Sequence, residues 1–238
     1  MQVRRTADRA ELNGAIKMKI LFIGNSYIYY NDMPMLFSKL ANENGRDVEV
    51  DSVTVGGRKL IQNLEHGDEH AKKISELATK NQYDILILQE QSYFALIEPD
   101  EFERGVGGLI SLVNAKTNLL YATWGRKSGS ELLEKYGWTS SQMGKLLDAA
   151  YCKAAEKYSA RVSHVGLCFE EIFREHAQIE LYNEDLSHPS YIGTCLGVIS
   201  HYRAIFGELP QKLDSLCLED SVAKLFLTTV EKYGDQYE

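Results

Sequence analysis

Five short apolar stretches recur along the chain, at residues 19–23, 48–53, 84–88, 118–123 and 161–165. None of them alternates cleanly between apolar and polar residues, a pattern typical of strands that are buried on both faces of a sheet. Helical apolar spacing fills the intervals and continues after the last stretch, at 33–44, 64–80, 99–113, 141–159, 167–177, 190–206 and 218–232. This alternation predicts an α/β fold in which a mainly parallel sheet lies between helices.

The first 17 residues differ from the rest of the chain. They are rich in charged side chains and lack a strong apolar periodicity, whereas residues 18–22 have the composition of a first strand. A length of 238 residues with 44% hydrophobic residues is usual for one α/β domain. We therefore expect a dispensable N-terminal extension at 1–17 and a single domain at 18–238. An upstream start codon and a docking helix would both explain the extension.

The net charge of the chain limits its partners. The formal charge is −8 and the isoelectric point is near 5.4, which argues against nucleic acid as a partner, because binding to phosphates needs clustered Lys and Arg. No apolar run approaches the roughly 18 residues of a membrane span, and the N-terminal segment is charged rather than apolar. The sequence therefore predicts a cytoplasmic protein without a membrane partner.

The four cysteines lie far apart, at Cys152, Cys168, Cys195 and Cys217, and no pair has C-x-x-C spacing. This spacing argues against zinc and against a disulfide framework, so we expect buried thiols and no metal. His66 and His70 have the i, i+4 spacing of helical ligands but lack a nearby third ligand.

Residues 193–197 have the form G-x-C-x-G around Cys195, which is a variant of a nucleophile elbow. That motif needs a strand directly before it. Here the preceding segment contains Pro189 and the following one is helical, so the match is predicted to be accidental.

Two segments carry candidate chemistry. Ser26 follows the first predicted strand directly, in the tetrapeptide 24–27, where a serine can act as a nucleophile. Asp185 and His188 supply an acid and an imidazole three residues apart, as a base and its orienting group require. Two structural alternatives remain: Ser26 could cap a helix, and Asp185 with Ser187 could cap the turn around His188.

The segments that follow the other predicted strands are also rich in functional groups. They are the glycine turn at 56–58, the amide-rich stretch at 89–92 and the segment that opens with Trp124. Because ligands bind outside the carboxyl ends of parallel strands, we expect all of these groups to meet at one edge of the sheet.

In the order and spacing of these blocks, the sequence resembles the SGNH (GDSL-like) hydrolase superfamily, in a branch with G-N-S in the first block. The blocks are Gly24-Asn25-Ser26, Gly56-Gly57, the stretch 89–92, and Asp185-x-x-His188. The resemblance covers roughly residues 19–207. It implies a three-layer α/β/α, flavodoxin-like sandwich with a mainly parallel five-stranded sheet. It also implies hydrolysis of an acyl ester through an acyl-enzyme, without a metal or an organic cofactor.

One block departs from that family, which usually has an asparagine after the third strand. This chain has Gln89 and Gln91 there instead. A glutamine amide carries the same NH2 donor on one extra methylene, so it can still contribute to an oxyanion hole. The predicted donors are the backbone N–H of Ser26, that of Gly57 or Gly56, and the side chain of Gln91. Gln89 is the alternative, because it continues the strand.

The predicted substrate is a small acyl ester. An acetyl group is the favoured acyl group, and an acetylated carbohydrate is one candidate. Tyr27 lies next to the serine and favours a ring or a short acyl group over a long chain. The segment 124–143 is polar and aromatic, and it is a candidate flap over the site. Trp124 and Trp138 could stack on a sugar ring, and Trp138 could equally anchor the flap to the core.

Two other functions remain open. A catalytically silent SGNH-like binding or interaction protein would explain the missing asparagine. A flavodoxin-like module would hold phosphate or flavin in the loop after the first strand, but this loop lacks the Ser, Thr and Gly that such a site needs. The sequence leaves open the alcohol half of the substrate, the choice between esterase and transacylase, and the oligomeric state.

Overall fold

The computed structural model describes residues 17–234, and its centre is one sheet of five parallel strands in the order β2-β1-β3-β4-β5. The strands are β1 (Met18–Gly24), β2 (Val48–Thr54), β3 (Ile85–Leu88), β4 (Thr117–Tyr121) and β5 (Arg161–Ser163). Each begins and ends within two residues of the predicted bounds.

Helices fill the connections between the strands. The α-helices are α1 (Ser26–Tyr29), α2 (Met33–Glu43), α3 (Glu69–Lys80), α4 (Phe94–Ile97), α5 (Pro99–Val113), α6 (Glu131–Tyr136), α7 (Ser140–Tyr158), α8 (Val165–Glu175), α9 (Tyr191–Phe206) and α10 (Asp220–Gly234). Three short 3-10 turns join them: η1 (Tyr30–Asp32), η2 (Leu60–Leu64) and η3 (Asp214–Leu216). Every predicted helix is present, while α1, α4 and α6 are additional.

One predicted helix begins later than expected. In the pattern 64–80, Leu64 ends the turn η2 and α3 begins only at Glu69. The side chain of Asp68 caps α3 by accepting the N–H groups of His70 and Ala71, each at 2.9 Å. An aspartate at this position satisfies two of the free donors at a helix N-terminus, which fixes where the helix starts.

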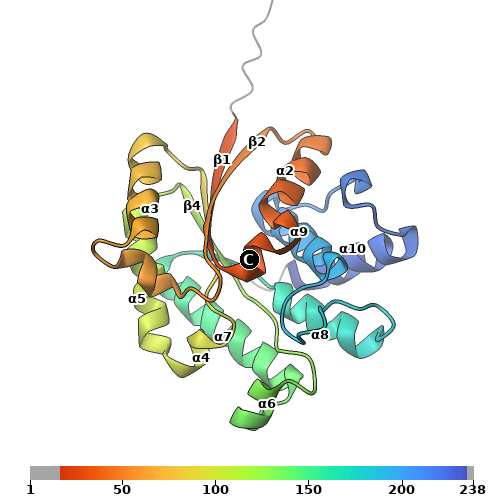
Figure 1. Ribbon diagram of the computed structural model, residues 1–238. Helices are drawn as coiled ribbons and strands as arrows, with labels where there is room; N and C mark the ends of the chain where they lie inside the picture. Colours follow the sequence, from red (N-terminus) through yellow and green to blue (C-terminus); the bar gives the residue numbers. More distant parts are fainter. Residues whose placement is uncertain (1–16, 235–238) are drawn as a thin grey trace, which may run out of the picture.

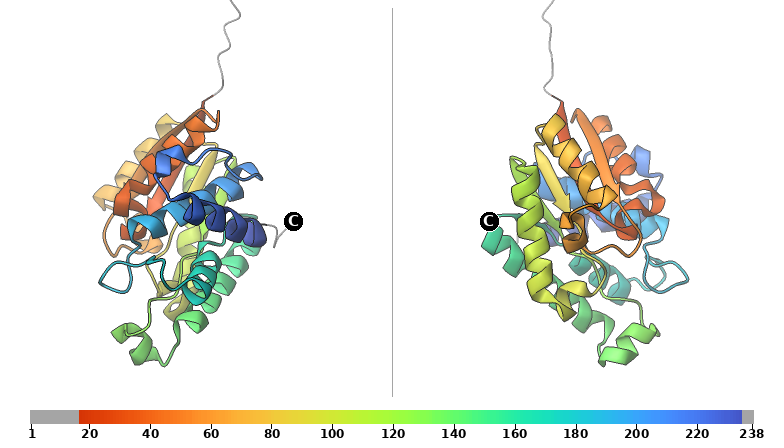
Figure 2. Two further views of the ribbon diagram at one scale, coloured as in Figure 1. Left: turned by 90° about the vertical axis from the view of Figure 1, so that its right-hand side faces the viewer. Right: turned by 60° about the vertical axis from the view of Figure 1, so that its left-hand side comes forward.

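The sheet lies between two helical layers (Figure 1; Figure 2), and successive strand residues point to opposite layers. In β1, Ile20 and Phe22 pack in a core with α2, α8, α9 and α10. Leu21 and Ile23 pack in a second core with α3, α5 and α7. The predicted three-layer α/β/α sandwich with a parallel five-stranded sheet is therefore confirmed.

The carboxyl ends of the strands point toward the bottom of Figure 1, where α6 projects beyond the sheet. This edge receives the loops that follow β1, β2, β3 and β4, which hold the predicted site residues other than Asp185 and His188; these two lie between α8 and α9. Of the predicted extension 1–17, residues 1–16 lie outside the described residues. Among residues 17–234, no helix is both long enough and apolar enough to cross a membrane.

Candidate active site

Ser26 lies at the turn from β1 into α1. Asn25 caps this helix: its Oδ1 accepts the N–H of Tyr27 at 3.2 Å, and its Nδ2 donates to the carbonyl of Arg58 at 3.1 Å. Gly24 leaves no room for a side chain, since an added Cβ would lie 2.7 Å from Oε1 of Gln89. The turn is thus fixed by packing and by Asn25. Ser26 is the first residue of the helix and not its cap.

Ser26, His188 and Asp185 form one hydrogen-bonded row. Nε2 of His188 lies 2.8 Å from Oγ of Ser26, and Nδ1 of the same ring contacts the carboxylate of Asp185. The other carboxylate oxygen accepts the N–H groups of Ser187 at 3.0 Å and His188 at 2.9 Å. Asp185 therefore caps the turn around His188 and also contacts the imidazole, so the two roles considered for it are compatible.

The environment of Asp185 favours its ionised form. Partial burial alone would raise the pKa of this carboxyl, but the hydrogen bonds from the His188 ring and from the two backbone N–H groups outweigh it, so the pKa lies below its usual range. An ionised Asp185 holds a proton on Nδ1 of His188, which leaves Nε2 free to accept the proton of Ser26.

Aromatic rings fix the orientation of His188. The ring of Tyr30 stacks on the imidazole, with centroids 4.2 Å apart and planes 9° from parallel, and Tyr27 packs edge-on at 5.4 Å. The hydroxyl of Tyr27 lies 2.7 Å from Oγ of Ser187, and Nε1 of Trp124 donates to the carbonyl of Ser187 at 3.0 Å. The loop that carries His188 is therefore held by three aromatic side chains.

Two predicted substrate contacts are wrong. Trp124 and Tyr27 are only 1% and 2% exposed, and their rings stack on each other with centroids 4.9 Å apart. The opposite face of Trp124 is covered by Phe169 at 3.9 Å. Neither ring has a free face for a sugar, because both fill the core beneath the His188 loop.

Trp138 occupies a different environment. It is half-buried, it stacks on Tyr136 with centroids 4.7 Å apart, and it packs against the core that contains α7. These contacts favour the anchoring role over the sugar-binding role that the sequence also allowed.

The two glutamines after β3 have separate roles. Gln89 is fully buried; its Oε1 accepts the N–H of Asn25 at 3.0 Å, and its Nε2 donates to the carbonyl of Glu90. Both polar atoms of its amide are used in these hydrogen bonds. The alternative prediction, that Gln89 is an oxyanion donor, is therefore wrong. The side chain of Gln91 has no hydrogen-bond partner among residues 17–234, and it lines a cavity beside Asp185. Gln91 remains the predicted donor.

The glycine turn after β2 lies against the serine turn. Val55 donates its N–H to the carbonyl of Gly24 at 3.2 Å, and the N–H of Arg58 closes the turn on Val55 at 3.2 Å. Gly57 has a φ of +67°, a conformation that side chains disfavour. Within the described part of the chain, the N–H groups of Ser26 and Gly57 have no hydrogen-bond acceptor. Both remain candidate oxyanion donors, with Gly56 as the alternative.

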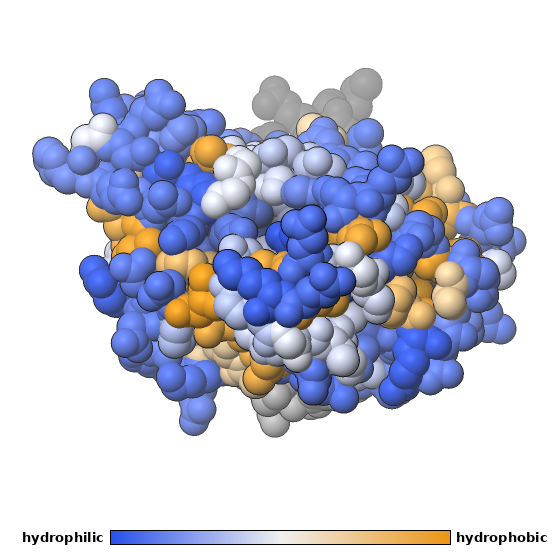
Figure 3. Space-filling view, turned by 60° about the horizontal axis from the view of Figure 1, so that its bottom comes forward, coloured by the Kyte–Doolittle hydropathy of each residue, from blue (hydrophilic) through white to orange (hydrophobic). Residues whose placement is uncertain are grey.

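A cavity of about 570 Å³ lies beside the triad and is bordered by the predicted flap. Its wall combines cations, acids and an aromatic ring: Gln91, Tyr93, Arg126, Gly129, Ser130, Glu131, Leu132, Lys135, Glu184, Asp185 and Leu186. Nε of Arg126 donates to Oγ of Ser92 at 3.3 Å, and its guanidinium lies 5.9 Å from the Tyr93 ring centroid. This side of the molecule is mostly hydrophilic, with hydrophobic residues in separate small areas (Figure 3).

Cys195 is not part of the site. It lies within α9 and is fully buried, and burial raises the pKa of its thiol to about 12. A buried thiol inside a helix has neither the exposure nor the thiolate fraction of a nucleophile. The G-x-C-x-G match is accidental, as predicted.

No protein-family model matches the sequence, and a comparison with curated proteins finds no match either. Solved structures are similar. A protein from Slackia heliotrinireducens classed as an SGNH hydrolase has a TM-score of 0.70 and 25% identity, over 79% of this chain and 99% of that one. A DUF4886 family protein from Bacteroides uniformis has a TM-score of 0.76 and 14% identity, over 93% and 97% of the two chains.

An acetyl xylan esterase is also similar, with a TM-score of 0.57 and 14% identity, over 79% of this chain and all of that one. Together with the parallel sheet and its two helical layers, these similarities settle the architecture. The protein has the fold of the SGNH (GDSL-like) hydrolases.

Proposed function

We propose that the protein is a serine esterase that hydrolyses small acyl esters through Ser26, His188 and Asp185. The observation that carries the proposal is the hydrogen-bonded row in which Nε2 of His188 lies 2.8 Å from Oγ of Ser26 while Nδ1 contacts Asp185. A nucleophile, its base and the group that orients the base are thus in contact in the order that acyl transfer needs.

The first half of the reaction forms an acyl-enzyme. His188 takes the proton of Ser26 as Oγ attacks the ester carbonyl, and it then gives that proton to the departing alcohol. Asp185 stabilises the imidazolium between these two transfers. In the second half, His188 takes a proton from water, the resulting hydroxide attacks the acyl group, and Oγ of Ser26 leaves with the proton.

The negative charge on the carbonyl oxygen needs donors that are already in place. The backbone N–H groups of Ser26 and Gly57 and the side chain of Gln91 are proposed to supply them, since none of these donors is used inside the described chain. Fixed donors of this kind need no reorganisation during the reaction, and losing one typically costs about 100-fold or more in rate.

The cavity beside the triad supports a polar alcohol group. It has Arg126, Lys135, Glu131 and Glu184 in its wall, and these side chains can hydrogen-bond to hydroxyl groups. Such a wall disfavours a long acyl chain, and the acetyl xylan esterase among the similar structures agrees with an acetyl ester of a carbohydrate. We therefore propose acetylated carbohydrates as the substrate class.

The test combines hydrolysis of p-nitrophenyl acetate with fluorophosphonate labelling. Wild type, Ser26→Ala and His188→Ala are compared with Ser221→Ala, which removes an exposed serine of α10 and serves as the matched control. Circular dichroism confirms that each variant is folded. Turnover and labelling are expected in the wild type and the control, and both are expected to disappear with Ser26.

A folded wild type that neither labels nor turns over would overturn the esterase proposal. That result would favour the alternative of a catalytically silent binding protein with this fold. Labelling that persists in Ser26→Ala would instead show that another residue is the nucleophile.

A further inference from the structure

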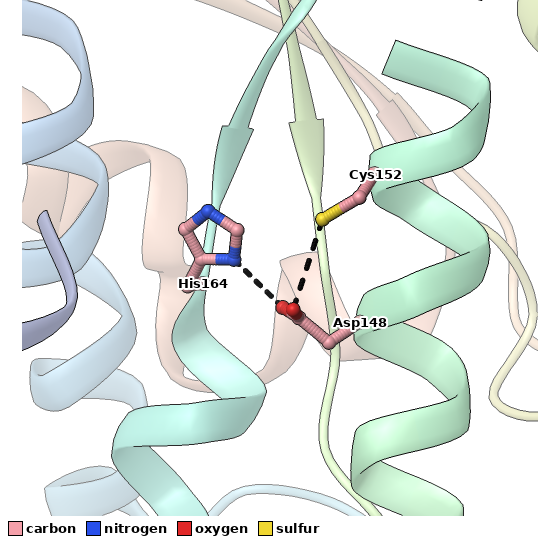
Figure 4. A group of neighbouring side chains, drawn as sticks. All are labelled: Asp148, Cys152 and His164. Atoms are coloured by element: carbon pink, nitrogen blue, oxygen red, sulfur yellow. Dashed lines mark hydrogen bonds and ion pairs between the residues drawn. The ribbon is translucent and has the colours of Figure 1, made fainter. Parts of the chain in front are cut away.

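A second group of polar side chains lies at the edge of the sheet, away from the triad. Asp148 and Cys152 are one turn apart on the same face of α7, and His164 follows the edge strand β5 directly. Figure 4 shows the imidazole facing Asp148 with the Cys152 sulfur beside it. Three strands separate β5 from the far edge strand β2, and the triad lies at the end of β1.

The ligand atoms of the three residues lie within 4.8 Å of one another. Nδ1 of His164 is 2.7 Å from Oδ1 of Asp148, and Sγ of Cys152 is 3.7 Å from Oδ2 of the same carboxylate. Asp148 and His164 are buried, and Cys152 is half-buried. Among residues 17–234 no other group of His, Cys, Asp and Glu has this spacing.

We propose that Asp148, Cys152 and His164 form a binding site for Zn²⁺. The three residues offer one thiolate, one imidazole and one carboxylate, a set that suits zinc and excludes Mg²⁺ and Ca²⁺, which need oxygen ligands. Around a tetrahedral zinc ion, sulfur and oxygen ligands lie about 3.5 Å apart, and nitrogen and oxygen ligands about 3.3 Å. The sulfur–oxygen separation between Cys152 and Asp148 is already close to this value. The nitrogen–oxygen separation requires His164 and Asp148 to move apart by roughly half an ångström.

The fourth position would open into a cavity. A hollow of about 540 Å³ is lined by Cys152 and His164, together with Lys153, Glu156 and Arg161. Three protein ligands with an open fourth position are typical of zinc sites that bind water or a small anion. The wall of the hollow carries Arg161 as a cation and Glu156 as an acid, while Lys153 pairs with Glu103 at 2.6 Å.

The contacts of Asp148 differ from those of the carboxylate in a site with a cysteine nucleophile. In such a site the thiol contacts the imidazole, and the carboxylate contacts the opposite side of the ring. Here the thiol and the imidazole both contact one carboxylate. A cation placed among the three groups balances the charges of the carboxylate and of the thiolate, which forms when the Cys152 proton is released to solvent on binding.

The test is a titration of the metal-free, reduced full-length protein with Co²⁺, a spectroscopic substitute for zinc, followed by displacement with Zn²⁺. All proteins carry Cys217→Ser, because Cys217 is an exposed thiol that would bind metal adventitiously. A thiolate-to-cobalt absorption band is expected to saturate at one equivalent. Metal bound at the triad would give no such band, because the triad has no thiol.

Three variants distinguish metal bound at the proposed site from metal bound elsewhere on the protein. Cys152→Ser is expected to abolish the band, and His164→Gln to weaken affinity by at least about 100-fold. Glu156→Gln is the matched control, since this exposed carboxylate lines the same cavity without belonging to the group. The proposal is overturned by the absence of a thiolate band, or by a band that survives Cys152→Ser.

A second measurement avoids any effect of the variants on folding. In the Cys217→Ser protein, alkylation of Cys152 by iodoacetamide is followed by mass spectrometry with and without metal. Zn²⁺ is expected to slow this alkylation by at least about tenfold, and Mg²⁺ to leave it unchanged. Equal rates with and without Zn²⁺ would refute the site.

Discussion

Glu90 is a buried carboxyl beside the candidate oxyanion hole, and its replacement by glutamine gives a sharp test of the structure. It follows β3 and is only 1% exposed. Its carboxylate accepts the N–H of Gln91 at 2.5 Å and the N–H of Leu60 at 3.2 Å. Burial raises the pKa of this carboxyl to about 7 from an ordinary value of 4.5, although both hydrogen bonds act in the opposite direction.

The direction of the pH effect follows from this shift. Folded protein holds the Glu90 proton up to about pH 7, whereas unfolded protein loses it near pH 4.5, so folding is favoured by the proton at acidic pH. That contribution is fully present below pH 4.5 and is lost as the pH rises through 7. For these two pKa values, the loss between pH 5 and pH 8 is about 2–3 kcal/mol.

Glu90→Gln removes the ionisation and keeps an oxygen that can accept both N–H groups. The free energy of unfolding, relative to wild type, is therefore expected to increase by about 2–3 kcal/mol from pH 5 to pH 8. Urea unfolding followed by circular dichroism measures it at both pH values. The matched control is Glu134→Gln, an exposed carboxyl of α6. The reasoning is refuted if the difference in the free energy of unfolding between Glu90→Gln and wild type is the same at both pH values.

Three further changes have definite expected outcomes. Gln91→Ala should lower kcat for p-nitrophenyl acetate by about 100-fold or more with a smaller change in KM, and an unchanged kcat would exclude Gln91 as an oxyanion donor. Gly24→Ala should destabilise the protein by about 1–3 kcal/mol in urea unfolding, because its Cβ would lie 2.9 Å from the backbone oxygen of Gln89. Trp124→Phe should lower kcat, because it removes the donor to the buried carbonyl of Ser187, at a cost of about 1–3 kcal/mol. Kinetics equal to wild type would show that Trp124 does not help to position His188.

The sheet and its long helices were predictable because each is encoded by a local pattern. Residues 20–23 are apolar on both faces of β1, and the structure buries Ile20 and Leu21 in opposite cores. The short helices were not predictable from periodicity: α1 has four residues and α6 has six, fewer than two helical turns. The late start of α3 depended on Asp68, whose capping role was visible in the sequence but lay inside an apparently continuous apolar pattern.

The proposed reacting groups could be predicted from the sequence because Ser26, Asp185 and His188 lie in short local motifs. Their surroundings were not, since a sequence does not show which side chains cover a ring. Tyr30 stacks on His188 across 158 positions, and Trp124 is covered by Tyr27 on one face and by a phenylalanine on the other. The group proposed to bind zinc was not found from the sequence for a related reason: the search for C-x-x-C spacing overlooks a carboxylate one helical turn before Cys152 and an imidazole directly after the next strand.

The burial of Tyr27 and Trp124 changes where substrate specificity must lie. Their polar atoms contact Ser187, next to His188, so they bear on the position of the base and have no free surface for recognition. In the proposed esterase, recognition of the alcohol would then depend on the cavity wall, which comes largely from the segment between β4 and α7. Arg126 connects the cavity wall with the side chains that position His188. It lines the cavity, and its Nε donates to Oγ of Ser92, which lies 3.2 Å from the hydroxyl of Tyr27. A change in the α6 segment should therefore alter which ester is accepted while the distance between Ser26 and His188 is kept.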